Sequence, residues 1–400
     1  MAKKNHDFFN EKKPWSEVKD ELLGCYLKPY LQKILHTRHP VVYVDCFAGK
    51  GAFADGKPGS PLIALQTIQE CLCQTRMQNC NIRSYFIDVN YAEDLRKNLH
   101  GYTNVNIISG RYEEQIAGIL KSKNGCNVFL YVDPYGIKAL NCSLFDSFAS
   151  QRFNSIELLI NMNSFGFIRE GCRVLGIKFE EDELMKDLIE YDSTQLASDE
   201  NSKAALNKIA GGDYWINIIE KKRKGEISAY DAEAEFADAY CKRLRESYAY
   251  VLNMPLRIKP GQVPKYRMIH ATNHPDGALI MVDNIFGRWE LMQDIQNGGQ
   301  QSFWDEDIDN GIIDEAEIES KVIEHLSHFT IFTRMNPIMA DFYCTHGVIC
   351  PSKTVKEIYK KLEKSKKLEV RRTPSTTATG RASSFFADEK NQITELRWRG

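Results

Sequence analysis

The stretch "VVYVDCFAGKG", residues 41–51, decides the fold. Four consecutive apolar or aromatic residues precede Asp45, a pattern typical of a strand that is buried on both faces. Small residues and two glycines, Gly49 and Gly51, follow at once, so the chain can turn tightly and bring its backbone close to a ligand. Such a turn could hold a dinucleotide, a phosphate or S-adenosylmethionine, and the stretch alone does not choose between them.

Strand-like and helix-like segments alternate over the first 163 residues. A helix is predicted over 15–36, and helical segments separate the strands that come after it. This alternation predicts an α/β fold with a doubly wound, mostly parallel sheet, whose ligands lie outside the carboxyl ends of the strands. The predicted strands are 41–47, 82–90, 105–109, 127–136 and 155–163.

The pattern along the rest of the chain predicts three further parts. The sheet with its N-terminal helix occupies 1–165, and a charged, helix-like stretch over 166–247 is read as an insertion. Residues 248–297 complete the sheet with an antiparallel hairpin at its edge, turning at "KPGQVP". The polar, glycine-bearing "GGQQSFWDEDIDNG" marks the boundary to a last domain, 298–400.

The last domain carries the positive charge of the protein. The chain has a net charge of −2, yet residues 351–400 contain thirteen Lys or Arg against six Asp or Glu. Three predicted helices followed by a two-stranded ribbon are the ingredients of a winged helix. We therefore expect this part to contact a phosphate backbone. The candidate residues are Lys366, Lys367, Arg371 and Arg372.

Composition excludes several other classes. With 400 residues, 43% of them hydrophobic, the chain can bury large cores, and no stretch approaches the roughly 18 apolar residues of a membrane span. The start lacks the apolar segment of a signal peptide, so a cytoplasmic protein is expected. The eleven cysteines form no C-x-x-C pair, and neither a disulfide framework nor a metal site is predicted.

The ends of the later strands narrow the choice of ligand. The G-x-G spacing, without a third glycine three residues on, weakens the dinucleotide reading, and the chain has no G-K-[ST] of a phosphate-binding loop. Asp88 ends the second strand, where a carboxylate can accept hydrogen bonds from ribose hydroxyls, although capping the next helix is the alternative. Arg111 and Tyr112, in the turn after the third strand, are candidates to touch adenine.

The fourth strand ends in "DPYG", residues 133–136, and this tetrapeptide indicates a chemistry. Methylating an exocyclic amine requires that its hydrogens be held so that the nitrogen lone pair meets a sulfonium methyl. Asp133 and the carbonyl of Pro134 would accept those hydrogens, and Tyr135 would stack on the base. The alternative is a strand-ending turn with a buried tyrosine.

These motifs resemble sequence motifs of known protein families. "DCFAGKG" with "DPYG" resembles the class I S-adenosylmethionine-dependent methyltransferases that act on exocyclic amines, and the D-P-[FY]-G form is similar to the tRNA guanine-N2 dimethyltransferases. "WSEVKDELLGCYL", "YVDCFAGKG", "GKPGSPLIAL", "VDPYG" and "HATNHPDG" together resemble the three-Cys-motif partner protein family. The likeness implies a nucleic-acid methyltransferase that works with a radical-SAM-like three-Cys-motif protein, in a phage-defence or mobile-element setting.

The resemblance also implies roles for individual residues. It places Asp133, Pro134 and Tyr135 at the reaction, and Gly136 beside the target base. Asn161 and His274 are further candidates for substrate contact, although either could instead cap a helix or lie at a helix start. The implied cofactor contacts are Lys19, Asp45, Phe47, Ala48, Gly49, Gly51, Asp88, Arg111 and Tyr112.

Two other functions remain open at this stage. A catalytically inactive methyltransferase fold could serve its partner as a nucleic-acid-binding scaffold. A nuclease or nucleotide hydrolase would need several carboxylates grouped around a metal, and the sequence indicates no such cluster. RNA or DNA as the substrate, and the base and nitrogen, stay undecided.

Overall fold

The structure is a computed structural model that describes residues 9–12, 14–74, 81–179, 200–256, 264, 266–288 and 314–400. The predicted domain boundary at 297–298 lies outside these residues, as does most of the predicted turn at 259–264.

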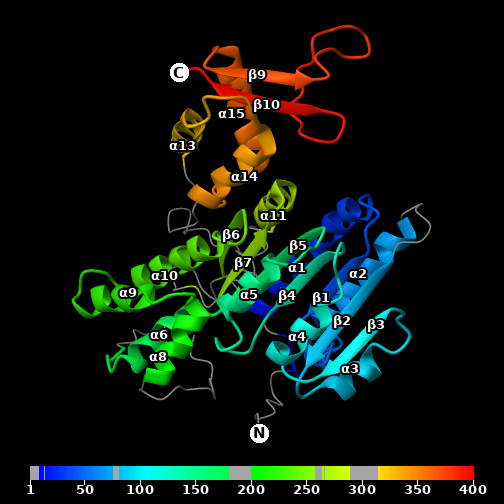
Figure 1. Ribbon diagram of the computed structural model, residues 1–400, viewed down its shortest axis with the longest axis vertical. Coiled ribbons are helices and arrows are strands. Elements are labelled where there is room, and N and C mark those ends of the chain that lie inside the picture. The colour runs from blue at the N-terminus through cyan, green and yellow to red at the C-terminus, as the bar shows by residue number, and fades with distance from the viewer. Residues whose placement is uncertain are drawn as a thin grey trace.

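A seven-stranded sheet forms the centre of the larger part of the molecule, in the order β3-β2-β1-β4-β5-β7-β6 (Figure 1). Neighbouring strands from β3 to β5 are parallel, whereas β7 runs antiparallel to both of its neighbours. This order and this single reversed strand confirm the predicted doubly wound sheet and match the class I methyltransferase fold. The strands are β1 (Val41–Asp45), β2 (Ile82–Asp88), β3 (Val105–Ser109), β4 (Asn127–Val132), β5 (Ser155–Met162), β6 (Tyr250–Leu256) and β7 (Tyr266–Thr272).

Helices cover both faces of the sheet, and the alternation of side chains along each strand supplies both cores. In β1, Val41 and Tyr43 join one core, while Val42 and Val44 join the other. The first core also contains residues of α1 (Pro14–Leu35), α2 (Ser60–Gln74), α3 (Ala92–Asn98) and α11 (Pro275–Gly287). The second contains residues of α4 (Tyr112–Leu120), α5 (Cys142–Ala149), α6 (Ser164–Val174), α8 (Glu200–Ala210), α9 (Tyr214–Arg223) and α10 (Ala229–Leu244).

Side-chain caps start several of these helices. Asn163 follows β5 and caps α6, accepting a hydrogen bond from the Gly166 amide at 2.7 Å. Ser228 and Asp231 form a reciprocal capping box at the start of α10. These two helices, with α8 and α9, occupy the stretch that was predicted as a helical insertion.

The C-terminal unit, described over residues 314–400, contains three helices in that range and a three-stranded sheet in the order β8-β10-β9. The two long strands are those of the predicted ribbon, and a two-residue strand, β8, is added at one edge. The assignment of the unit to the winged-helix class stays a prediction. Its elements are α13 (Glu315–Ser327), β8 (Thr333–Arg334), α14 (Met335–His346), α15 (Ser352–Lys364), β9 (Leu368–Thr373) and β10 (Ile393–Trp398).

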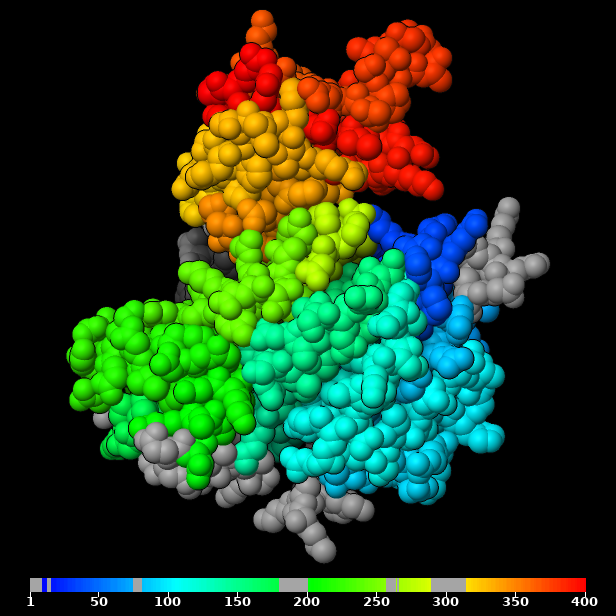
Figure 2. All heavy atoms as spheres, viewed as in Figure 1, coloured from blue at the N-terminus to red at the C-terminus, as the bar shows by residue number. Residues whose placement is uncertain are grey.

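The C-terminal unit packs on α11 and shares its hydrophobic core with the first face of the large sheet (Figures 1 and 2). Asp283 of α11 accepts hydrogen bonds from the amide and hydroxyl of Ser352, which hold the start of α15. Asp276, near the start of α11, accepts one from Asn336 at 2.7 Å. No helix within the described ranges combines the length and the apolar character that crossing a membrane requires.

A buried ion pair fixes α10 against β7 at the edge where the parallel strands end. Glu233 is fully buried, and its two carboxylate oxygens accept hydrogen bonds from the guanidinium of Arg267, both at 2.6 Å. The hydroxyl of Ser164, at the start of α6, donates to the same carboxylate. Three elements are thereby joined by one charged group that has no access to water.

We expect the loss of either partner of this pair to destabilise the protein strongly. Glu233→Leu and Arg267→Met each leave one buried charge unpaired, which costs about 3–5 kcal/mol of unfolding free energy. The double variant should lose much less than the sum of the two, because no charge is then left unpaired. Urea unfolding measures all three. Arg96→Met, which breaks the exposed pair with Glu93, serves as a control whose unfolding free energy should stay within about 1 kcal/mol of wild type. If the double variant lost the sum of the two single losses, Glu233 and Arg267 would not be coupled.

Candidate active site

Asp133 lies immediately beyond the carboxyl end of β4 and accepts hydrogen bonds from three side chains. The ammonium of Lys19, on α1, donates to both carboxylate oxygens, at 2.9 and 2.7 Å. Asn161, near the end of β5, donates its amide to Oδ1 at 2.7 Å, and the hydroxyl of Tyr131 reaches Oδ2 at 3.4 Å. Lys19 also lies over the ring of Tyr266, 5.1 Å from its centre. A carboxylate, an ammonium and an amide from three separate elements therefore meet at one point.

Asn161 leaves one polar atom unused. Its side chain is 2% exposed, and because its amide nitrogen donates to Asp133, its Oδ1 is directed elsewhere. Among the described residues this oxygen has no hydrogen-bond partner. A buried acceptor without a donor costs free energy, so it is an atom for which a bound ligand would supply a partner.

The remaining residues of "DPYG" differ in their exposure to solvent. Pro134 is buried and rigid, and Gly136 adopts a positive φ of 92°, a conformation that glycine tolerates best. Tyr135 is 49% exposed, one of the three large hydrophobic side chains that are exposed among the described residues. The alternative of a buried tyrosine is therefore wrong.

The glycine turn after β1 is organised by two carboxylates. Asp45 is fully buried and accepts hydrogen bonds from the Ser60 hydroxyl at 2.7 Å and the Phe47 amide at 3.2 Å. Gly49 and Gly51 have φ values of 59° and 81°, so the turn needs glycine at both positions. Ala48 is buried, and its amide donates to the main chain at the end of β2.

Asp88 links the glycine turn to β2. Its Oδ2 accepts from the Gly49 amide at 3.0 Å, while Oδ1 accepts from the amides of Asn90 and Tyr91 at 2.7 and 2.8 Å, just before α3. Asp88 therefore fixes the turn before α3 but is not its cap, because Tyr91 holds the N-cap position and no described side chain caps this helix. Oδ2 accepts a single hydrogen bond from the described residues, and a carboxylate oxygen can accept a second.

Arg111 and Tyr112 stand at the start of α4, as their place after β3 predicts. Arg111 is exposed at the N-cap position, whereas Tyr112 is 2% exposed and its ring lies 5.3 Å from that of Phe47. The hydroxyl of Tyr112 is buried without a hydrogen-bond partner among the described residues. The two rings form one side of the glycine turn.

His274 is not brought to this edge of the sheet. Because β7 is antiparallel, its last residue, Thr272, pairs with Glu157 near the start of β5. His274 follows there and caps α11, its Nδ1 accepting from the Asp276 amide at 3.2 Å. The structure thus places His274 at the edge opposite to Asp133.

The four basic residues predicted in the C-terminal domain divide into two kinds. Lys366, Lys367 and Arg371 are exposed. Arg372 instead makes two hydrogen bonds of 2.7 Å with Glu363 and a third with the Phe385 carbonyl. Arg372 is thus committed to the fold of its own domain, and its charge is already neutralised.

Sequence reasoning missed one aromatic residue at the site. Phe9 lies against the glycine turn, since a Cβ atom added to Gly49 would come within 2.9 Å of its ring. The Phe9 carbonyl accepts from the Ala54 amide, and Lys12 is paired with Asp20 at 2.6 Å, so the segment is fixed on both sides. Phe9 stands in a polar stretch with no periodic pattern, and no signal in the sequence distinguishes it.

Comparisons with known proteins give only distant likenesses. No family model matches the chain, and no curated protein matches it. Among solved structures, protein LPL1258 from Legionella pneumophila str. Philadelphia 1, described with the family model DUF519, is similar at a TM-score of 0.40 and 11% identity, over 72% of this chain and 95% of that one. The plantazolicin methyltransferase BamL, solved with a triazolic desmethylPZN analogue and SAH, is similar at a TM-score of 0.29 and 14% identity, over 65% and 86%. At these TM-scores neither likeness bears on the site.

The burial of Asp45 generates a prediction about pH. Burial raises the pKa of Asp45 from 3.8 to about 7, against the opposing effect of the Ser60 hydroxyl. The folded state therefore binds a proton that the unfolded state releases, and this contribution to stability is complete below pH 4 and lost as the pH rises through 7. Asp45→Asn removes the titration. Relative to wild type, the variant should gain up to about 4 kcal/mol between pH 4 and pH 8, measured by urea unfolding.

Asp55 provides the matched control for this experiment. It is exposed in the same turn, and the hydrogen bond from the Lys57 amide is the main cause of its lowered pKa. Asp55→Asn should therefore show the opposite trend: below pH 4, its unfolding free energy relative to wild type should fall as the pH rises. A pH profile of Asp45→Asn that runs parallel to wild type would contradict the assignment.

Proposed function

We propose that this protein is an S-adenosylmethionine-dependent N-methyltransferase that acts on an exocyclic amine of a nucleobase in RNA or DNA. One observation carries the proposal: a carboxylate held by Lys19 and Asn161 at the end of β4, followed directly by a buried proline and an exposed tyrosine. β4 pairs with β1, so this group stands beside the glycine turn at the same edge of the sheet. The two halves of a methyl-transfer site are thereby adjacent.

The residues at the glycine turn fit the cofactor. The positive φ values of Gly49 and Gly51 let the chain turn tightly after β1, with Phe9 packed at Gly49 and α3 at Gly51. Oδ2 of Asp88, beside the same turn, can accept a hydrogen bond from a ribose hydroxyl. The unpartnered Oδ1 of Asn161 offers a further acceptor. When bound, S-adenosylmethionine supplies a methyl group on a sulfonium sulfur.

The residues of "DPYG" would prepare the amine. The Asp133 carboxylate and the Pro134 carbonyl accept the two amine hydrogens, which keeps the nitrogen lone pair out of conjugation with the base. Tyr135 stacks on the base and holds it in place. After transfer the nitrogen must lose a proton, and Asp133 is the neighbouring carboxylate that can take it. In the structure as it stands, Lys19 balances the charge of Asp133.

The partner and the target molecule belong to the same proposal. The exposed lysines and Arg371 of the C-terminal unit would contact nucleic-acid phosphates, as in a winged-helix domain. By resemblance, a three-Cys-motif protein would be the partner, in the cytoplasm and in a phage-defence setting. Mass spectrometry of nucleosides from cells with and without the gene would identify the base and separate RNA from DNA.

One observation favours a second candidate, the catalytically inactive scaffold. Asp133 accepts hydrogen bonds from Lys19 at both oxygens and from Asn161 at one, so most of its acceptor capacity is already used. A carboxylate so occupied can only receive a substrate amine if Lys19 moves. The catalytic and scaffold proposals therefore differ in what happens when Asp133 is removed.

We expect S-adenosylmethionine binding to depend on the glycine turn, and calorimetry measures it. Asp88→Ala should weaken affinity about tenfold or more, because a hydrogen bond to a charged group is lost. Gly49→Ala should weaken it as well, through backbone strain at the ligand. Gly56→Ala is the matched control, since Gly56 has a φ of 83° and open space around it. Unchanged binding in both Asp88→Ala and Gly49→Ala, with the fold intact by thermal melting, would remove the cofactor site.

Variants of Asp133, Tyr135 and Lys19 should affect different steps of the proposed reaction. Asp133→Ala should lower single-turnover methylation about 10²-fold or more while changing cofactor affinity little. Tyr135→Ala should weaken substrate binding and Tyr135→Phe should be mild, because the ring carries the stacking. Lys19→Met should shift the pH profile of turnover, since the charge beside Asp133 is gone. If Asp133→Ala left nucleoside modification at the wild-type level, the scaffold would be the function.

A further inference from the structure

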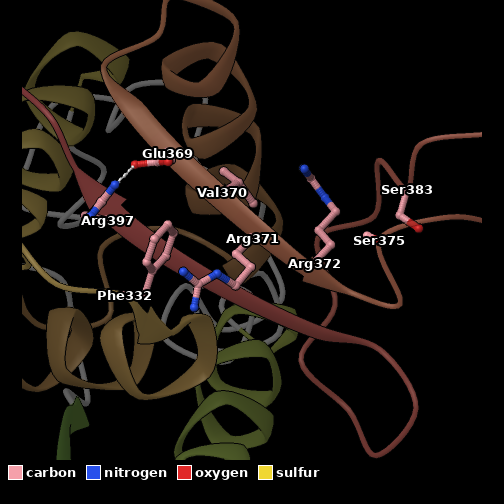
Figure 3. Close-up of a pocket in the computed structure, with 8 residues that line it drawn as sticks. All are labelled: Phe332, Glu369, Val370, Arg371, Arg372, Ser375, Ser383 and Arg397. Atoms are coloured by element: carbon pink, nitrogen blue, oxygen red, sulfur yellow. Dashed lines mark hydrogen bonds and ion pairs between the residues drawn. The ribbon is translucent and has the colours of Figure 1, made fainter.

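The C-terminal unit carries a hollow of about 480 Å³ on its sheet (Figure 3). Leu368 and Leu396 point from this sheet into the core, so alternation places Glu369, Arg371 and Arg397 on the opposite face. The loop that follows β9 closes one side. The lining residues are Phe332, Glu369, Val370, Arg371, Arg372, Ser375, Ser383 and Arg397.

An aromatic ring between two guanidinium groups forms the floor of the hollow. The Cζ atoms of Arg371 and Arg397 lie 3.8 and 4.5 Å from the centre of the Phe332 ring, and Figure 3 shows that ring between them. Glu395 lies 3.7 Å from Arg371, and Glu369 accepts a hydrogen bond of 2.8 Å from Arg397. The two planar cations are therefore held in place, with donors of Arg371 to spare.

A buried hydroxyl without a partner lies at the loop end of the hollow, away from the two guanidinium groups (Figure 3). Ser383 is 8% exposed, and its Oγ has no hydrogen-bond partner among the described residues. The Ser383 amide donates to the Ser375 carbonyl at 2.8 Å, which pins the loop across the hollow. A lining hydroxyl that is buried and unpartnered is a group for which a ligand would supply an acceptor.

We propose that this hollow binds one nucleotide of a single-stranded segment of RNA or DNA, and this rests on the proposed function. The base stacks on the outer plane of the Arg371 guanidinium, which Phe332 supports from beneath. The phosphate takes the spare donors of Arg371, and the Ser383 hydroxyl is available to a polar group of the strand at the loop end of the hollow. The volume is that of a small-ligand site. Of its three arginines, Arg372 and Arg397 are each hydrogen-bonded to a glutamate, whereas Arg371 lies 3.7 Å from Glu395 and keeps donors for a ligand.

The lining favours a single strand over a duplex or an acidic peptide. A duplex keeps its bases stacked inside and presents phosphates, and Arg372 is already committed to Glu363, so few cations remain for such a backbone. The carboxylates of an acidic peptide could bind the same cations, but they provide no planar ring to stack on the Arg371 guanidinium. A single strand has exposed bases that can stack on the Arg371 guanidinium and phosphates that can bind its charge.

The test measures binding of a labelled single-stranded oligonucleotide of about ten nucleotides to the full chain by fluorescence anisotropy. Arg371→Ala and Phe332→Ala should weaken binding about tenfold. Arg371→Lys should weaken it nearly as much, because it keeps the charge and loses the plane. Lys321→Ala, on α13, is the control that removes a cation elsewhere on the unit and should leave affinity unchanged. Equal melting temperatures confirm that the variants fold.

Three results would overturn the inference. These are no loss in Arg371→Ala and Phe332→Ala, full retention in Arg371→Lys, or an equal loss with a duplex or with polyglutamate as the probe. Calorimetry with S-adenosylmethionine on the same variants separates the two proposals, because the hollow variants should bind the cofactor normally. If the wild type bound the oligonucleotide through the hollow but bound no cofactor, the hollow would stand and the proposed function would fall.

Discussion

The ion pair between Lys19 and Asp133 is the interaction on which the candidate active site depends. It ties the first helix to the end of β4, across more than a hundred residues of chain, and it lets a carboxylate stand at the edge of an apolar sheet with its charge balanced. Asn161 then fixes the orientation of that carboxylate from β5. Without Lys19, Asp133 would lose the cation that makes its partial burial tolerable, and the present position of its carboxylate would no longer be fixed.

The same solution is used elsewhere in the sheet, where buried charges are each held by several donors. Glu157 sits at the amino end of β5 and accepts from the hydroxyl of Tyr26 on α1, with the His270 ring of β7 at 3.1 Å. Glu233 and Arg267 form the corresponding pair at the carboxyl edge. α1 thus makes polar contacts at both edges of the sheet, through Tyr26 at the amino end of β5 and through Lys19 just beyond the carboxyl end of β4.

The sequence could predict the parts of the site that come from strand ends. Asp45, Asp88 and Asp133 each follow a short apolar run, and parallel neighbours bring their ends together, so local pattern and topology suffice. The sequence does not say which strand of the late hairpin runs antiparallel, so it leaves His274 open between a substrate contact and a helix start. The structure has the second, with His274 capping α11.

Other features depend on partners distant in sequence, which local patterns do not reveal. Arg372 looks like any exposed basic residue until the fold brings Glu363 and the Phe385 carbonyl to it. Phe9 and Phe332 lie in stretches without periodicity, and their roles come from Gly49 and from Arg371 and Arg397, which chain connectivity alone does not place beside them. The local sequence pattern thus identifies candidate binding residues, whereas contacts between distant segments determine which of them remain free to bind a ligand.

The shared core between α11 and the C-terminal helices adds a last constraint. Because α14 and α15 bury their apolar faces against the same core as the large sheet, and Asp283 holds the start of α15, the C-terminal unit is not a tethered module. If the proposed function holds, a single strand bound to that unit would reach Asp133 at one fixed spacing. The target nucleotide would then be selected by its position along the strand, and Tyr135 and Asp133 would select only for a base with an exocyclic amine.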